Sequence, residues 1–241
     1  MRLGGPAVLS APETESVQFQ SDGFTITAFL ARPAKILDRL PALLVLHEWW
    51  GLNDHTKDVA QRFAKEGYIA LAPDLYSRLG NKVTQDPNEA ATLMSALSSQ
   101  AALRDVNAAV RYFKLLDTVD PLRLGIVGFS MGGSLALTMA THNSDLKAAV
   151  VCYGKVPLIE SLDALLCPLA YHYGARDGWV TKQEVALLQQ GLEKFGKTGR
   201  VFTYPDAGHA FFNDTRREVY RSQDAQLAWQ RSLAFLREYL V

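Results

Sequence analysis

The segment Leu124-Gly125-Ile126-Val127-Gly128-Phe129-Ser130-Met131-Gly132-Gly133 decides the fold, because it joins a buried strand to a helix through the pattern Gly-x-Ser-x-Gly. Its apolar start is typical of a strand, and the small residues over 132–142 are typical of a helix. A serine at such a junction lies on a tight turn, where Gly128 and Gly132 let strand and helix approach each other. The helix N-terminus also favours a developing negative charge. We interpret Ser130 as a candidate nucleophile; the alternative is a glycine-rich turn with a capping serine.

Strand and helix patterns alternate on both sides of this segment. Buried strands are predicted at 41–46, 68–72, 148–154, 169–174 and 200–204, and helices at 55–66, 89–116 (broken near 98–101), 181–195 and 224–240. Residues 17–20 and 24–30 alternate apolar and polar side chains around a turn, which predicts an antiparallel hairpin. This order predicts an α/β fold with a mostly parallel central sheet, an N-terminal hairpin and helices on both faces. We expect residues 1–16 to be a loose lead-in and 17–241 to be a single domain.

Composition and charge exclude several classes of partner. The chain has 241 residues, is 48% hydrophobic, and balances 25 Lys and Arg against 25 Asp and Glu. A neutral chain is a poor ligand for nucleic acid or an anionic membrane, since both reward a basic face. No apolar run approaches the ~18 residues that span a bilayer. The N-terminus lacks a secretory apolar region, so we expect a cytoplasmic protein. Cys152 and Cys167 lie in apolar segments, where we expect reduced, buried thiols.

A serine nucleophile needs a base and an acid, which in this strand–turn–helix architecture follow it in the order acid, then base. Asp177 follows one predicted strand in Gly174-Ala175-Arg176-Asp177, and His209 follows the last one. Both lie at carboxyl ends of strands, on the same edge of the sheet as Ser130. We expect His209 to take the serine proton and Asp177 to orient the imidazole. Asp206 and Asp163 are the competing acids; of the other histidines, His142 ends a helix and His172 lies inside a strand, so we expect structural roles for both.

The loop His47-Glu48-Trp49-Trp50-Gly51 follows the strand expected beside the nucleophile strand. A second oxyanion donor belongs at this position, so we assign the backbone N–H groups of Met131 and Trp49 to an oxyanion hole. The His-Glu pair does not continue to the pattern H-E-x-x-H, because position 51 is glycine, and a zinc protease is excluded. We expect no metal site.

Five blocks of the chain, in order, resemble the dienelactone hydrolase family of the α/β-hydrolase fold. They are residues 47–53, Ala72-Pro73-Asp74-Leu75-Tyr76, the segment around Ser130, residues 174–177 and Ala207-Gly208-His209-Ala210-Phe211, and the likeness extends over about 17–240. The resemblance implies hydrolysis of dienelactones (carboxymethylenebutenolides) to maleylacetate, or of other small esters and lactones. It also implies that no metal or organic cofactor is needed. Family precedent and the neutral charge lead us to expect a monomer.

The nucleophile is one departure from the family, whose best-known members have cysteine where this chain has Ser130. In those members a glutamate at the position of Glu48 helps to generate the thiolate. A serine cannot be activated in this way, because the pKa of its hydroxyl is far above that of a thiol. Glu48 could instead position Ser130, orient water, shape the pocket, or be a buried carboxylate bound to the backbone. Ser130 could be the natural residue or a replaced cysteine.

The substrate-binding residues are a second departure. The best-known members hold a substrate carboxylate with two arginines; Arg78 matches one, and Asn213 stands at the position of the other. The alternative for Arg78 is a solvated loop residue. Several aromatic residues flank the predicted catalytic loops and could form an apolar wall for a planar ring, each with a core role as the alternative. They are Trp49, Trp50, Tyr76, Trp179, Phe211 and Phe212. The rival functions are a short-chain carboxylesterase without a lactone role and a catalytically silent binding module.

Overall fold

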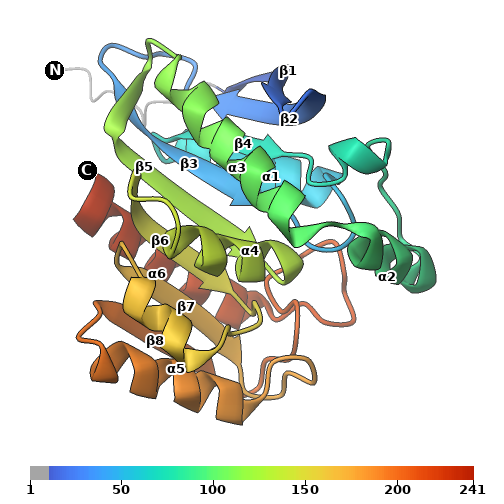
Figure 1. Cartoon of the computed structure of the whole chain (residues 1–241), viewed down its shortest axis with the longest axis vertical. Coiled ribbons are helices and arrows are strands. Elements are labelled where there is room, and N and C mark those ends of the chain that lie inside the picture. Colours follow the sequence, from blue (N-terminus) through green and yellow to red (C-terminus); the bar gives the residue numbers. More distant parts are fainter. Residues whose placement is uncertain (1–10) are drawn as a thin grey trace, which may run out of the picture.

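A computed structural model describes residues 11–241, in which an eight-stranded sheet forms the central layer (Figure 1). The strands are β1 (Glu13–Ser21), β2 (Phe24–Arg32), β3 (Leu40–Leu46), β4 (Ile69–Pro73), β5 (Val119–Phe129), β6 (Leu146–Cys152), β7 (Leu169–Gly174) and β8 (Gly199–Tyr204). Their order across the sheet is β1-β2-β4-β3-β5-β6-β7-β8. Strands β3 to β8 run parallel, whereas β2 is antiparallel to both β1 and β4. The predicted fold class is confirmed.

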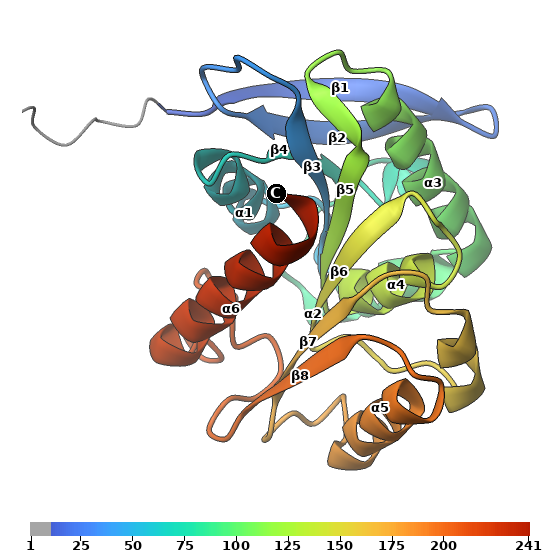
Figure 2. The same ribbon diagram turned by 90° about the vertical axis from the view of Figure 1, so that its left-hand side faces the viewer.

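Helices cover both faces of the sheet. They are α1 (Asp54–Lys65), α2 (Pro87–Ala96), α3 (Ser99–Lys114), α4 (Met131–Ala140), α5 (Lys182–Lys194) and α6 (Ser222–Leu240), with short 3-10 turns η1 (Ser77–Leu79) and η2 (Ile159–Ala164). Figure 2 shows α1 and α6 on one face and α3, α4 and α5 on the other. Within residues 11–241, none of the helices combines the length and the apolar character needed to cross a membrane.

Two apolar cores result, one under each helical layer. Side chains of successive residues in β3 enter opposite cores: Leu44 packs with α3 and α4, whereas Val45 packs with α1 and α6. Such a strand needs apolar residues at every position, which is why 41–46 has no polar alternation. Cys152 and Cys167 are free and buried, as predicted.

The N-terminal hairpin extends further than its sequence pattern indicates. Strand β1 begins at Glu13, so part of the predicted lead-in pairs with β2, as in Glu13 opposite Arg32. Arg32 contacts the carboxylates of Glu13 at 3.1 Å and Glu15 at 3.3 Å. These residues are polar because β1 is an edge strand with little to bury, and the alternation therefore begins only at Val17. Residues 1–10 of the lead-in lie outside the described residues, and the single domain over 17–241 stays a prediction.

Candidate active site

Ser130 lies at the turn between β5 and α4 with a positive φ of 51°, which non-glycine residues rarely adopt. The turn needs two glycines: a Cβ on Gly128 would lie 2.2 Å from the carbonyl oxygen of Gly132, and one on Gly132 would lie 2.5 Å from that of His47. These distances confirm the predicted close approach of strand and helix. The backbone N–H of Ser130 donates to the carbonyl of Cys152 at 2.9 Å, which fixes the turn to β6.

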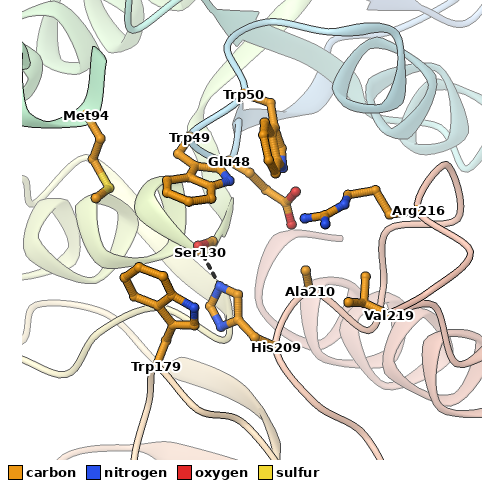
Figure 3. A pocket seen from close by; sticks show the side chains of 10 residues that line it. All are labelled: Glu48, Trp49, Trp50, Met94, Ser130, Trp179, His209, Ala210, Arg216 and Val219. Atoms are coloured by element: carbon orange, nitrogen blue, oxygen red, sulfur yellow. Dashed lines mark hydrogen bonds between the residues drawn. The ribbon is translucent and has the colours of Figure 1, made fainter. Parts of the chain in front are cut away.

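Three residues that are far apart in sequence form a hydrogen-bonded chain at this turn. The Oγ of Ser130 lies 2.8 Å from Nε2 of His209, and Nδ1 of His209 lies 2.8 Å from Oδ2 of Asp177 (Figure 3 shows the first bond). The other carboxylate oxygen of Asp177 accepts the backbone N–H groups of Trp179 (2.7 Å) and Val180 (3.0 Å). The Asp177 side chain is fully buried, whereas 23% of the His209 side chain is exposed. A carboxylate only accepts, so Nδ1 carries the proton and Nε2 can accept one from Ser130.

The residues that competed with Asp177 and His209 for the acid and base roles lie away from Ser130. Asp206 pairs with Arg176 at the surface, where 74% of its side chain is exposed, and Asp163 is exposed in η2. His172 is enclosed between the Tyr204 hydroxyl (2.8 Å) and the Ser232 hydroxyl (3.0 Å). Burial lowers the pKa of His172 to about 3, so it is a neutral core residue, as predicted for a histidine inside a strand.

A pocket of about 340 Å³ opens above Ser130 and His209 (Figure 3). Its wall is mainly apolar and also contains the carboxylate of Glu48 and the guanidinium of Arg216. The lining residues are Glu48, Trp49, Trp50, Met94, Ser130, Trp179, His209, Ala210, Arg216 and Val219. A pocket of this size and polarity suits a small ring substrate with one or two polar groups.

The carboxylate of Glu48 is held by two side chains. Its Oε1 accepts the hydroxyl of Tyr153 at 3.1 Å, and its Oε2 accepts the amide of Asn213 at 2.8 Å. Burial and the neighbouring Glu48 carboxylate raise the pKa of Tyr153 well above its ordinary value, which keeps the phenol protonated as a donor. Glu48 is thus a buried carboxylate bound by side chains, not by the backbone, and it faces the pocket beside Ser130.

Of the two predicted oxyanion donors, Met131 follows Ser130 directly in the chain, whereas Trp49 is distant in sequence but lines the same pocket as Ser130. Met131 is the first residue of α4, so its N–H has no partner within the helix. Within residues 11–241, the backbone N–H groups of Trp49 and Met131 have no backbone acceptor. Both are therefore available to a substrate oxygen. The carbonyl of Trp49 accepts the Tyr76 hydroxyl at 2.9 Å, which fixes this loop.

Arg78, predicted to bind the substrate carboxylate, does not line this pocket. Its guanidinium binds both oxygens of Asp105 (2.9 and 2.7 Å) and the carbonyl of Ser21 (3.1 Å). It also lies 4.1 Å from the ring centroid of Phe24. The prediction of a substrate contact is corrected, because the donors of Arg78 are engaged in joining η1 to α3 and the hairpin.

Three further predicted substrate contacts are buried structural residues. Phe211 is fully buried against the rings of Tyr153 (5.5 Å) and Tyr204 (4.8 Å). Tyr76 is also fully buried, and Asn213, which is 1% exposed, binds Glu48. None of the three lines the pocket around Ser130, because each side chain points into the protein. Trp50 does line the pocket, together with Trp49 and Trp179, which were also predicted to form its aromatic wall.

Sequence reasoning missed Arg216. Its guanidinium carbon lies 4.8 Å from the ring centroid of Trp50, and it forms an ion pair with Glu218 at 2.6 Å. It is the cation of the pocket wall. The available signal was the Arg216-Arg217 pair in the loop that follows His209, but an exposed loop offers no pattern that says which arginine turns inward. Met94, which lies in α2, also lines the pocket and was not predicted from the sequence.

Known proteins share this fold and sequence over almost the whole chain. A model of the dienelactone hydrolase family matches residues 26–240. A protein of Escherichia coli (strain K12) named as a carboxymethylenebutenolidase is 34% identical over 236 residues, which cover 91% of this chain and 84% of that protein. A Bradyrhizobium sp. protein named as a 2-oxo-3-(5-oxofuran-2-ylidene)propanoate lactonase is 32% identical, covering 93% of this chain and 94% of its own. A Klebsiella pneumoniae crystal structure described as a dienelactone hydrolase superposes with a TM-score of 0.89 at 32% identity, covering 95% of this chain and 100% of that one.

Proposed function

The chain belongs to the dienelactone hydrolase family and is a hydrolase, and from that premise we propose that it cleaves small lactones or esters through an acyl-enzyme on Ser130. The observation that carries the proposal is the pair of 2.8 Å contacts that link Ser130, His209 and Asp177. The nucleophile is then a serine hydroxyl, where the best-known members have a cysteine thiol. A hydroxyl needs the adjacent base because it is not ionised by itself.

The acylation step follows from these contacts. The Oγ of Ser130 bonds to the acyl carbon while its proton moves to Nε2 of His209, and Asp177 stabilises the imidazolium that forms. The negative charge on the carbonyl oxygen is held by the N–H groups of Trp49 and Met131, a type of interaction worth about 3–4 kcal/mol per donor. When the acyl–oxygen bond breaks, His209 returns the proton to the leaving oxygen. In a lactone this oxygen stays attached to the acyl group, so the ring opens.

We assign Glu48 to the second half of the reaction. Tyr153 and Asn213 each occupy one of its carboxylate oxygens, and each oxygen has a further lone pair that can accept a hydrogen bond from a water in the pocket. A water held there and deprotonated by His209 would attack the acyl-enzyme, release the acid and restore the Ser130 hydroxyl. Orienting water is a role compatible with a serine nucleophile, whereas forming a thiolate is not.

For the substrate, we propose a small planar lactone that carries a carboxylate. The names of the two relatives describe butenolide rings bearing an acidic side chain. In this chain the apolar wall contributed by Trp49, Trp50 and Trp179 suits such a ring. Arg216 is the cation that would meet the carboxylate, in the role first predicted for Arg78.

The proposal is tested by hydrolysis of p-nitrophenyl acetate and of a dienelactone by Ser130→Ala and His209→Ala. Turnover of both substrates should fall at least 100-fold, since a positioned general base contributes about 10²–10⁴-fold. His142→Ala is the matched control, because this histidine is exposed at the end of α4. Turnover of His209→Ala at the wild-type level would refute the mechanism. Absence of hydrolysis in the wild type, together with failure of a fluorophosphonate to label Ser130, would favour a silent binding module.

A further inference from the structure

We infer that His47 is a positioning residue that aims the backbone N–H of Trp49 at the reacting carbonyl oxygen. The inference rests on the proposed function, since it concerns one of the two oxyanion donors. His47 is fully buried at the end of β3 and touches no substrate, so it would act only through the peptide it holds.

The contacts of His47 determine which ring nitrogen carries its proton. The backbone N–H of Leu75 donates to Nε2 of His47 at 3.0 Å. An amide N–H can only donate, so Nε2 has a free lone pair and the proton of the neutral ring is on Nδ1. That Nδ1–H donates to the carbonyl oxygen of Glu48 at 2.5 Å. Asp74, whose Oδ1 lies 3.7 Å from Nε2, accepts the N–H of Tyr76 at 2.9 Å instead.

This hydrogen bond sets the direction of the Trp49 N–H. The carbonyl of Glu48 and the N–H of Trp49 belong to the same peptide unit, which is planar and trans, so the two bonds point in opposite directions. Because His47 draws the carbonyl oxygen toward the buried imidazole, the N–H is turned away from it and toward the pocket. Without this bond, the peptide could rotate and remove the donor.

Two more hydrogen bonds fix the same loop. The hydroxyl of Tyr76 donates to the carbonyl of Trp49 at 2.9 Å, and its ring packs edge-on against His47 at 5.3 Å. The carbonyl of His47 itself accepts the N–H of Gly132 at 3.1 Å. Gly132 follows Met131, the other oxyanion donor, in α4. The two donors are therefore tied to each other through the backbone of His47.

The test compares two variants that each retain one half of the imidazole. His47→Asn places an amide near the position of Nδ1, which can still donate to Glu48, but it loses the acceptor for Leu75. His47→Gln places an amide oxygen near Nε2 and provides no donor for Glu48. For both we would measure kcat and KM for p-nitrophenyl acetate, inhibition by a boronic acid that forms a tetrahedral adduct, and thermal stability.

We expect His47→Gln to lower kcat about 10- to 100-fold with KM within threefold, because removing an oxyanion donor outright costs about 10²–10³ in kcat. Boronate affinity should fall in proportion, while His47→Asn keeps kcat within about fivefold of wild type even if it is the less stable variant. Equal kcat losses in both variants, or boronate affinity that stays at the wild-type level, would overturn the inference. If His47→Gln does not fold, His47→Leu decides in its place, because it also removes the donor to the Glu48 carbonyl. A proportional loss of kcat and boronate affinity is expected, and unchanged values would overturn the inference.

Failure of this inference differs from failure of the proposed function. A wild type that needs Ser130 and His209 for turnover, combined with a fully active His47→Gln, would remove only the role of His47. Turnover that survives in Ser130→Ala would instead remove the acyl-enzyme itself.

Discussion

The side-chain amide of Asn213 donates to Oε2 of Glu48 at 2.8 Å. Asn213 was predicted to contact the substrate, but in the structure it holds the carboxylate of Glu48. The neutral amide of Asn213 donates a hydrogen bond to Glu48, whereas an aspartate at this position would place two carboxyl groups in contact. Two carboxylates at hydrogen-bond distance share a proton, which raises the pKa of one of them.

We therefore expect Asn213→Asp to lower dienelactone turnover roughly tenfold at pH 8, with recovery toward acid pH as one carboxyl becomes protonated. The measurement is the pH profile of kcat. Asn143→Asp is the control, because it makes the same exchange at a residue bonded to Asn107, away from the pocket. An unchanged profile for Asn213→Asp would mean that Glu48 takes no part in turnover.

Arg216 should discriminate between charged and neutral substrates. A charge-assisted hydrogen bond contributes about 1.5–3 kcal/mol, so Arg216→Gln should lower kcat/KM for a carboxylate-bearing lactone about 10- to 100-fold. The value for p-nitrophenyl acetate should stay within about threefold. Arg217→Gln, an exposed neighbour, is the control. Equal losses for both substrates would point to a short-chain esterase without an anionic substrate.

Arg78 should matter for stability and not for catalysis. The side chain of its partner Asp105 is 2% exposed, so Arg78→Met leaves a buried carboxylate unpaired, which costs roughly 3 kcal/mol of unfolding free energy. Arg104→Met is the matched control, because its ion pair with Asp22 is half exposed and should contribute less than about 1 kcal/mol. Urea unfolding measures the difference. A selective loss of lactone hydrolysis in Arg78→Met would restore its role in substrate binding.

His172 should make the fold sensitive to acid. Its pKa is about 3 in the folded protein, against the ordinary value of 6.5. Between these pH values the unfolded chain binds a proton that the folded chain does not, so stability falls as pH decreases through this window, by roughly 1.4 kcal/mol per pH unit at most.

The measurement is the unfolding free energy from pH 7 to pH 4 in the wild type and in His172→Gln, which should show a shallower slope. His142→Gln replaces an exposed histidine and should leave the slope unchanged. The same slope in wild type and His172→Gln would show that His172 titrates normally.

Sequence alone determined the layered α/β fold and the proximity of Ser130, Asp177 and His209. The reason is physical: strands buried on both faces are continuous apolar runs, parallel strands bring their carboxyl ends to one edge, and glycines mark the turn at which strand and helix meet. These are properties of short segments, so they can be read along the chain without knowing the packing.

Only the tertiary structure decided which polar side chains face the pocket. Arg78 lies in the short turn η1 and Arg216 in a loop. Neither local sequence shows that Arg78 binds Asp105 of α3 or that Arg216 lies beside Trp50. The same holds for the tautomer of His47, which depends on the N–H of Leu75, a residue 28 positions away. Such assignments depend on partners that folding brings together, because a side chain adopts the orientation of lowest free energy among the charges and donors within its reach.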